Sequence, residues 1–342
     1  MNKKQISDLA DRPHARILNV EEARNLVADG WAAADLHVHT LHSYDVIPTR
    51  QVDPLTLYQK ARRLGMTYIA FTDHDSMDAY DQMGWTREGL VPAVEVKILD
   101  PKKVGHTVHI NVFALDRGQF CEILKIARLA QDLERLVAYL KDEHLRFTFN
   151  HPFWHEPGEK PNLRAICDIV ELFPVLEYNM GRIARINKQA LRLAQARGRG
   201  IVATTDTHVG EIGRAFTIAR GGTFVEFFDQ IQIGQSFIVP ADLNISRLKK
   251  ETTIRIRQLF DKAGWLYPKD SLAIDTGSAI LDGIIARLAN ARPDPPGFAK
   301  KILEIILEAA SRSGIPGSLY FRSQRNLADQ ISGLLESKEI AA

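Results

Sequence analysis

The sequence predicts an α/β fold in which strands and helices alternate along most of the chain. Apolar runs of strand length are separated by amphipathic helical patterns, and tight hairpin turns between the runs are missing. Histidine and aspartate follow directly after several of the apolar runs, which is the strand end where α/β barrels build their sites. These observations favour a mostly parallel sheet, open or closed into a barrel, followed by a helical C-terminal region.

The first elements set a strand–helix–strand order. A helical pattern over residues 20–28 precedes a strand-like run over residues 32–38. The next helix, predicted over residues 53–64, carries proline at its second position and Gly65 as its C-cap. A strand over residues 67–71 follows.

The later elements continue the same alternation as far as about residue 240. Amphipathic helices with an apolar stripe fill the gaps between short apolar runs. Further strands are predicted over residues 90–98, 106–114, 147–150, 169–176 and 201–204, with helices over residues 121–143 and 183–196.

The chain divides by composition into three parts: a lead-in over residues 1–31, the strand-containing region over residues 32–240 and a helical extension over residues 241–342. The extension contains no histidine, so we expect it to serve packing, oligomerisation or lid formation. Its predicted helices are residues 243–263, 278–290, 298–313 and 323–337.

Composition places the chain among ordinary globular proteins. Its 342 residues are 45% hydrophobic and 25% charged, and its net charge of +2 gives no strong footprint for nucleic acid or membrane. Cys121 and Cys167 lie in apolar surroundings, so reduced core thiols are expected. The chain lacks an apolar run of the roughly 18 residues that span a bilayer, and we expect a cytoplasmic protein without a membrane partner.

Two short motifs at strand ends indicate a metal site. His37 and His39 are two residues apart, which on a strand places both imidazoles on one face, able to share an ion. Asp206 and His208 repeat this spacing at a later strand end. Imidazole and carboxylate ligands together suit Zn, Mn or Fe.

Glu95 is the acidic residue that the pattern explains least easily. It lies in an otherwise apolar strand, where a buried carboxylate is costly unless it is paired or bound to a cation. Lys97 offers one explanation, a buried salt bridge on the same face. A bound metal offers the other, because His74, His109 and His151 also lie in or directly after predicted strands.

The order of these motifs resembles the PHP family, named for polymerase and histidinol phosphatase domains. The resemblance covers residues 32–235 and comprises HxH in DLHVHT, the TDHD segment, a lone glutamate followed by VHI, and the closing DxH. It implies a distorted, TIM-like (β/α)7 barrel with a trinuclear metal site, followed here by a C-terminal helical extension.

The resemblance also implies which residues hold each ion. In the family pattern, a further ligand follows shortly after the HxH motif. We assign this ligand to Asp45, with His42 as the nearest alternative. His106, three residues before His109, would point to the opposite face and lie in an outer shell or at the surface. The implied ligands are His37, His39, Glu95 and Asp206 for the first ion, Glu95, His109 and His151 for the second, and Asp45, His74 and His208 for the third.

Around these ligands the family pattern implies a metal-bridging hydroxide as nucleophile between the first two ions, so Glu95 and Asp206 belong to the catalytic centre. Arg182 would bind substrate phosphate, with Arg185 as second candidate and solvated arginines at a helix start as the alternative. Asp73 and Asp75 would orient ligands, and Asn150, Asn179 and Trp154 would shape the pocket.

We therefore expect a metal-dependent phosphoesterase with two or three divalent ions (Zn, Mn or Fe). Its substrate would be a small phosphorylated molecule, a nucleotide or the end of an oligonucleotide. A metal-dependent amidohydrolase on the same site is the alternative enzyme, because Lewis-acid ions serve acyl transfer as well. A non-catalytic PHP binding module is the alternative outside enzymes, and the C-terminal helices could support a homo-oligomer.

Overall fold

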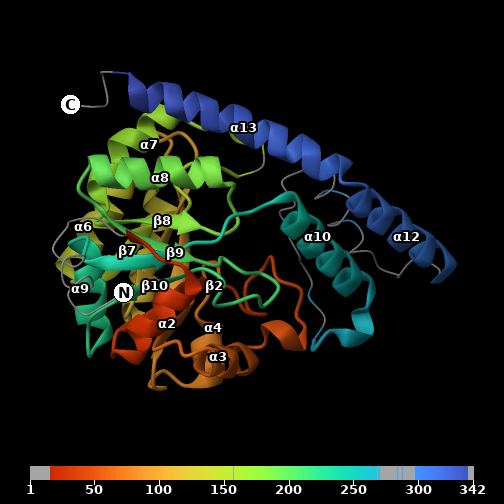
Figure 1. Cartoon of the computed structure of the whole chain (residues 1–342), viewed down its shortest axis with the longest axis horizontal. Coiled ribbons are helices and arrows are strands. Elements are labelled where there is room, and N and C mark those ends of the chain that lie inside the picture. The colour runs from red at the N-terminus through yellow and green to blue at the C-terminus, as the bar shows by residue number, and fades with distance from the viewer. Residues whose placement is uncertain are drawn as a thin grey trace.

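The computed structural model describes residues 16–156, 158–267, 269, 283, 287 and 297–337. Its strands form two sheets surrounded by helices, so the predicted α/β class is confirmed (Figure 1). The six-stranded sheet has the order β1 (Arg16–Ile17), β11 (Ser236–Val239), β10 (Phe216–Ala219), β2 (Ala32–Val38), β3 (Tyr68–Phe71) and β4 (Leu90–Val91). The five-stranded sheet has the order β5 (Ala93–Leu99), β6 (Thr107–Phe113), β7 (Arg146–Phe149), β8 (Val175–Asn179) and β9 (Gly200–Thr204).

Helices cover the sheets and extend beyond them. Those up to residue 232 are α2 (Val20–Ala28), α3 (Pro54–Arg63), α4 (Asp78–Met83), α5 (Arg117–Lys125), α6 (Leu133–Asp142), α7 (Leu163–Ile169), α8 (Ala184–Ala196) and α9 (Phe224–Gln232). The later ones are α10 (Ile245–Phe260), α12 (Gly297–Ser313) and α13 (Ile315–Glu336). Short turns of helix lie at η1 (Arg50–Val52), η2 (Ile126–Ala130), η3 (Val170–Leu172) and η4 (Lys262–Gly264).

The strands are less uniformly parallel than predicted, because five of the nine described strand pairs are parallel and four are antiparallel. β6 runs antiparallel to both β5 and β7, and β10 runs antiparallel to β2 and β11. The hydrogen-bond ladders of the described strands form two sheets and show no closed barrel. Single bridges link the sheets, one joining Val38 to Thr207 and one joining His74 to Glu95.

Prolines explain two errors in the predicted strands. The strand predicted over residues 169–176 is helical in its first part, and β8 begins only after Pro174. Pro92 divides the strand predicted over residues 90–98 into β4 and β5, since proline has no N–H to donate to a ladder.

Two further elements differ from the prediction. The helix predicted over residues 121–143 is interrupted after η2, where Gln131 adopts a left-handed backbone with φ of 51°. Strand β10, which supplies the antiparallel centre of the larger sheet, was not predicted at all.

Local signals account for the helices that precede the site. Asn19 and Glu22 form a reciprocal capping box at the start of α2. Asp53 caps α3 by accepting from the backbone N–H of Thr56, and Pro54 occupies the first turn, where its missing N–H costs nothing. Each such cap is worth about 0.5–2 kcal/mol.

Asp35 anchors strand β2 to the loop that follows β9. Its buried carboxylate accepts hydrogen bonds from the Thr205 amide at 3.1 Å, the Thr205 hydroxyl at 2.7 Å and the Gly213 amide at 3.1 Å. Burial outweighs these hydrogen bonds and raises the pKa of Asp35 to about 6. The anchored loop carries Asp206 and His208, so this contact fixes two strand ends relative to each other.

The C-terminal helices make two main packing contacts, one between α13 and α8 and one between α10 and α12. Figure 1 shows α13 running along α8, with α10 and α12 beside each other at one end of the molecule. The helix predicted over residues 278–290 lies outside the described residues apart from Gly283 and Arg287. Within the described part of the chain, no helix is long and apolar enough to cross a membrane.

The two cysteines differ in their surroundings. Cys167 is buried, whereas Cys121 is exposed on α5, so the expectation of a core thiol was wrong for Cys121. The apolar residues around it in sequence belong to the opposite, buried face of that amphipathic helix, on which Phe120 and Ile123 lie.

Candidate metal centre

His37 and His39 converge at the carboxyl end of β2. Their Nε2 atoms lie 3.1 Å apart, and both side chains are fully buried. The Asp206 Oδ1 atom lies 3.1 Å from His39 Nε2 and 3.3 Å from His37 Nε2. The two motifs that the sequence places at separate strand ends therefore meet.

The Glu95 carboxylate lies at the centre of the cluster, and its two oxygens face different imidazoles. Oε2 lies 3.1 Å from His37 Nε2, 3.3 Å from His39 Nε2 and 3.1 Å from His74 Nδ1. Oε1 lies 3.1 Å from His109 Nδ1 and 3.3 Å from His151 Nε2.

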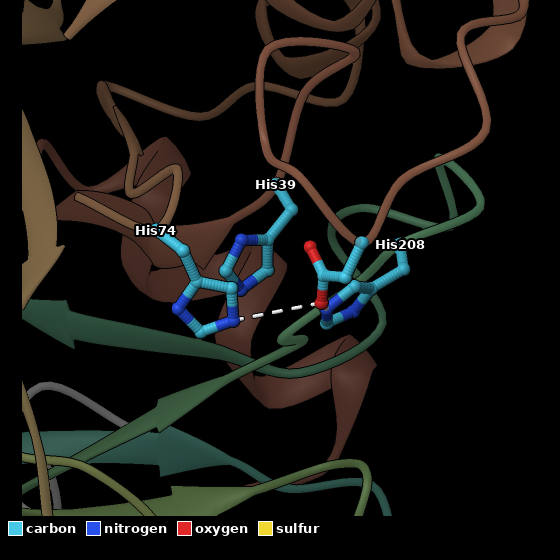
Figure 2. A group of neighbouring side chains, drawn as sticks. His39, His74 and His208 are labelled. Atoms are coloured by element: carbon cyan, nitrogen blue, oxygen red, sulfur yellow. Dashed lines mark hydrogen bonds and ion pairs between the residues drawn. The ribbon is translucent and has the colours of Figure 1, made fainter. Parts of the chain in front are cut away.

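Asp45 lies at a third corner of the cluster. Its Oδ2 atom is 2.7 Å from His208 Nε2 and 3.5 Å from His74 Nε2. Figure 2 shows the rings of His39, His74 and His208 turned toward one another, and the His39 and His208 rings stack at 4.2 Å between centroids. His42 instead points away, with its Nε2 atom 2.7 Å from Gln82 Oε1.

These residues form three overlapping groups of potential ligand atoms. Within each group the ligand atoms all lie within 4.8 Å of one another. Imidazole nitrogen and carboxylate oxygen are the donors that Zn, Mn and Fe accept, so the donor set fits divalent transition metals. The groups are His39, Asp45, His74 and His208; His37, His39 and Glu95; and His74, Glu95 and His109.

A further carboxylate, Glu177, supports the cluster from β8. Its Oε1 atom lies 2.7 Å from His37 Nδ1, and its Oε2 atom accepts the His151 backbone N–H at 2.7 Å. Such a carboxylate fixes the orientation of an imidazole and raises its basicity as a ligand.

Two asparagines hold the carboxylates of the cluster. Asn150 donates to Glu95 Oε1 at 2.8 Å. Asn179 donates to Glu177 Oε2 and to Asp206 Oδ2, both at 3.0 Å. Each carboxylate is therefore fixed by a neutral donor without losing its charge.

Two of the proposed ligands have strained backbone conformations. His151 and Asp206 adopt positive φ angles of 26° and 47°, a region that non-glycine residues rarely occupy. Such a conformation costs on the order of 1–3 kcal/mol and is retained where the surroundings over-determine it. Here the amide of Asp206 donates to the His37 carbonyl at 2.8 Å, and that of His151 donates to Glu177.

The protonation equilibria reflect the dense negative charge. Burial alone would lower the pKa of His39, but hydrogen bonds with Asp206 and Glu95 outweigh it and raise the pKa to about 10. Burial would likewise raise the pKa of Glu95, and the neighbouring imidazoles hold that pKa well below its usual range. The carboxylates therefore stay ionised, and protonated imidazoles balance part of their charge where no ion is bound.

Arg182 and Trp154 flank the cluster on the side of His109 and His151. The Trp154 ring makes edge contacts with both imidazoles, at 4.8 Å and 5.1 Å between centroids. The Arg182 guanidinium lies over the Trp154 ring, 5.4 Å from its centroid. Its buried Nε has no hydrogen-bond partner among the residues that the structure describes. Arg185 points elsewhere and pairs with Asp329 of α13 at 2.8 Å.

Lys97 does not pair with Glu95. Its ammonium lies 2.7 Å from Glu156, so the salt-bridge explanation of the buried Glu95 was wrong. Strand β5 pairs with β6 along its whole length, and Lys97 lies opposite His109 in this pairing.

The aspartates flanking His74 contact other groups. Asp73 accepts from the amide and hydroxyl of Thr40, both at 2.6 Å, and so supports the chain just after His39. Asp75 accepts from the Lys97 amide and pairs with Arg128 at 3.0 Å.

His106 is buried and is absent from the groups of potential ligand atoms, so of the two expected positions, an outer shell or the surface, the surface was wrong. Its Nδ1 atom accepts a long hydrogen bond of 3.4 Å from the Asn162 amide. His106 directly precedes β6, and the side chain of Asn162, at the start of α7, donates to the nearby Val104 carbonyl at 3.1 Å.

Sequence reasoning missed Glu177, Glu156 and Ser43. Glu177 carries the same signal as Glu95, an acid within an apolar strand, and was overlooked because that strand was placed too early. Glu156 lies 3.4 Å from His109 Nε2 in an irregular segment without a readable pattern. Ser43 donates to Asp45 Oδ1 at 2.6 Å, and a single serine in a loop gives no sequence signal for such a contact.

Comparisons with known proteins give structural likenesses only. No protein-family model matches the chain, and no curated protein matches it. PsfC from Pseudomonas syringae PB-5123 is similar with a TM-score of 0.46 at 18% identity, over 62% of this chain and 92% of that one.

Two more solved structures resemble this chain at a similar level. A two-domain protein from Bacteroides vulgatus, described as containing a predicted PHP-like metal-dependent phosphoesterase, has a TM-score of 0.44 at 15% identity, over 67% and 69% of the two chains. The lesion-specific endonuclease PfuEndoQ from Pyrococcus furiosus has a TM-score of 0.44 at 14% identity, over 61% and 57%. At these values the activity has to be inferred from the site itself.

The position of Asp45 yields the first testable prediction. Asp45→Asn should weaken the binding of one ion by at least the roughly 10–100-fold that changes around a metal ligand cost, because it removes an anionic oxygen from between His74 and His208. His42→Asn is the matched control and should leave every affinity unchanged, since His42 contacts Gln82. Stepwise metal titration of both variants measures this, and a reversed outcome would reassign the ligand to His42.

Proposed function

We propose that this chain is a metal-dependent phosphoesterase that hydrolyses a small phosphorylated molecule, a nucleotide or the end of an oligonucleotide. The observation that carries the proposal is the position of Glu95, whose two oxygens face separate sets of buried imidazoles. A carboxylate in that position can bridge two ions. Two divalent ions a few ångströms apart suit in-line displacement at phosphorus.

In this proposal each ligand keeps the assignment that the PHP resemblance implies. His37, His39, Glu95 and Asp206 hold the first ion, and Glu95, His109 and His151 hold the second. Asp45, His74 and His208 hold the third. The short distances from Glu95 to His109 and from Asp45 to His208 support this division, as does the largely buried position of the donors.

Divalent ions in this centre supply Lewis acidity and bring the pKa of water close to neutrality. The chain's own residues do the positioning. Glu177 orients His37, and Asn179 orients Asp206, so neither ligand is free to rotate away. The rigid strand ends keep the donors in place before any substrate arrives, which lowers the reorganisation needed during reaction.

Arg182 favours a phosphoester over an amide as substrate. Its guanidinium lies over Trp154 beside the cluster, and its buried Nε is unpaired among the described residues. A planar guanidinium matches the oxygens of a phosphate with two parallel hydrogen bonds. An amide substrate brings no anion that would need this residue.

The same proposal includes the barrel fold and the cellular location of the chain. We propose a cytoplasmic protein with a PHP-type barrel over residues 32–240 and a helical extension over residues 241–342, and the motif order favours the barrel. The bridge between His74 and Glu95 supports it, because it brings β3 and β5 of the two sheets together in the way that a barrel wall would.

The direct test of the proposed function compares substrate classes on one metal-loaded sample. Protein stripped by a chelator and reloaded with Zn, Mn or Fe should hydrolyse phosphomonoesters, nucleotides or 5′-phosphorylated oligonucleotides, and the stripped protein should not. Turnover of amides alone would favour an amidohydrolase. Metal binding without turnover of any substrate class would favour a binding module.

Arg182 gives the second mutational prediction. Arg182→Ala should lower kcat/KM for a phosphomonoester by roughly 10–100-fold, because hydrogen bonds to a charged group are worth about 1.5–3 kcal/mol. Arg185→Ala is the matched control, since Arg185 is exposed and pairs with Asp329. Both variants should keep the metal content of the unmodified protein, and equal losses in the two would contradict a phosphate-binding role for Arg182.

A further inference from the structure

The ammonium of Lys269 lies among three backbone carbonyls of the loop that carries Asp45. It donates to the carbonyl oxygens of Leu41 at 3.2 Å, Val46 at 2.8 Å and Ser43 at a shorter distance. An ammonium has three N–H donors, so the three carbonyls match its capacity. Leu41, Ser43 and Val46 are buried, and buried carbonyls need such partners.

Other residues near Lys269 hold the same loop. The Tyr267 hydroxyl donates to the Leu41 carbonyl at 2.6 Å, and the Leu266 amide donates to the Pro48 carbonyl at 2.8 Å. Trp265 forms a β-bridge with Thr49. The C-terminal extension therefore contacts the loop at both of its ends.

Apolar packing adds to these hydrogen bonds. Ile47, at the far end of the loop, is buried against Leu259 and Phe260 of α10 and Leu307 of α12. This small cluster is separate from the main core, so the loop depends on the extension for the burial of that side chain.

Ser43 connects the clamped backbone with the metal centre. Its hydroxyl donates to Asp45 Oδ1 at 2.6 Å and lies 3.3 Å from His39 Nδ1. The backbone amide of His74 points at the same hydroxyl from 3.3 Å. A shift of Ser43 would therefore move Asp45 relative to His74 and His208.

We propose that Lys269 is a positioning residue that fixes Ser43 and thereby holds Asp45 where it can ligate an ion, so that the C-terminal extension completes the metal centre. This inference rests on the proposed function, since it takes Asp45 as a ligand. It gives the histidine-free extension a role in the chemistry that its own sequence does not display. Burial lowers the pKa of Lys269 to about 8, so the ammonium form still predominates at pH 7.

The test is a stepwise metal titration of the full chain with Zn or Mn in competition with a chromophoric chelator. Lys269→Met keeps the length of the side chain and removes its donors, so it should weaken one ion by about 10–100-fold and leave the other affinities unchanged. Lys301→Met is the matched control, because Lys301 is an exposed lysine of the same extension that pairs with Glu304. It should bind every ion as the unmodified chain does.

A double-mutant cycle shows whether the effect passes through Ser43. If it does, Lys269→Met should add little to the loss already caused by Ser43→Ala. Additive losses would overturn the proposed route. Equal weakening of all ions together with lower stability of the metal-free protein would show a general structural role and overturn the inference.

Further measurements distinguish a failure of this inference from a failure of the proposed function. If Lys269→Met does not fold, Tyr267→Phe removes one hydrogen bond from the same clamp and should weaken the same single ion by a smaller factor. An unmodified chain that binds no ions would refute the proposed function. A normal unmodified chain with fully normal Lys269→Met and Tyr267→Phe variants would refute this inference alone.

Discussion

The fully buried carboxylate of Glu95 has to be compensated by the groups around it, and this need organises the cluster. An ionised carboxylate removed from water costs several kcal/mol unless positive charge or hydrogen bonds compensate it. Here the compensation comes from imidazoles at the ends of β2, β3, β6 and β7 and from one amide donor, Asn150. Without a metal, protonation of His37 and His39, whose pKa values are raised, balances part of the charge of Glu95, Asp45 and Asp206, and bound cations could take the place of those protons. Divalent metals fit that need, because each ion brings two charges and accepts several of these donors at once.

The fold serves this cluster by bringing distant strand ends to one point and holding them rigidly. Asp35 ties β2 to the loop after β9, and single bridges join the two sheets at Val38 and at His74. The positive φ angles of His151 and Asp206 show that the surroundings impose the backbone conformation at these ligands. Asp45 differs from Glu95 and Asp206, because it lies farther from a strand, in the loop between β2 and η1. That loop is held by residues far along the chain, which links the helical extension to the site.

Much of the metal centre could be predicted because its signals are local. Two ligands spaced by two residues at the end of an apolar strand can be recognised without knowledge of tertiary structure. Glu177 was not predicted as a site residue because its strand was placed over residues 169–176, which end just before it. The strand in fact begins after Pro174. The proposed role of Lys269 could not be predicted, because it depends on contacts with backbone carbonyls more than two hundred positions away in sequence. The mixed strand directions were missed for a similar reason, since the antiparallel pairing of β5 with β6 crosses a loop without any typical hairpin signal.

The metal content of the purified, reconstituted chain and of its Glu95→Gln variant would show whether Glu95 lies between bound ions. Glutamine keeps the size of the side chain and removes the charge that would bridge two ions. We expect two or three divalent ions in the unmodified chain, a clear loss in Glu95→Gln and a much smaller change in Lys97→Gln, whose ammonium pairs with Glu156 and not with Glu95. Fewer than one ion per unmodified chain, or equal metal content in the two variants, would contradict this expectation.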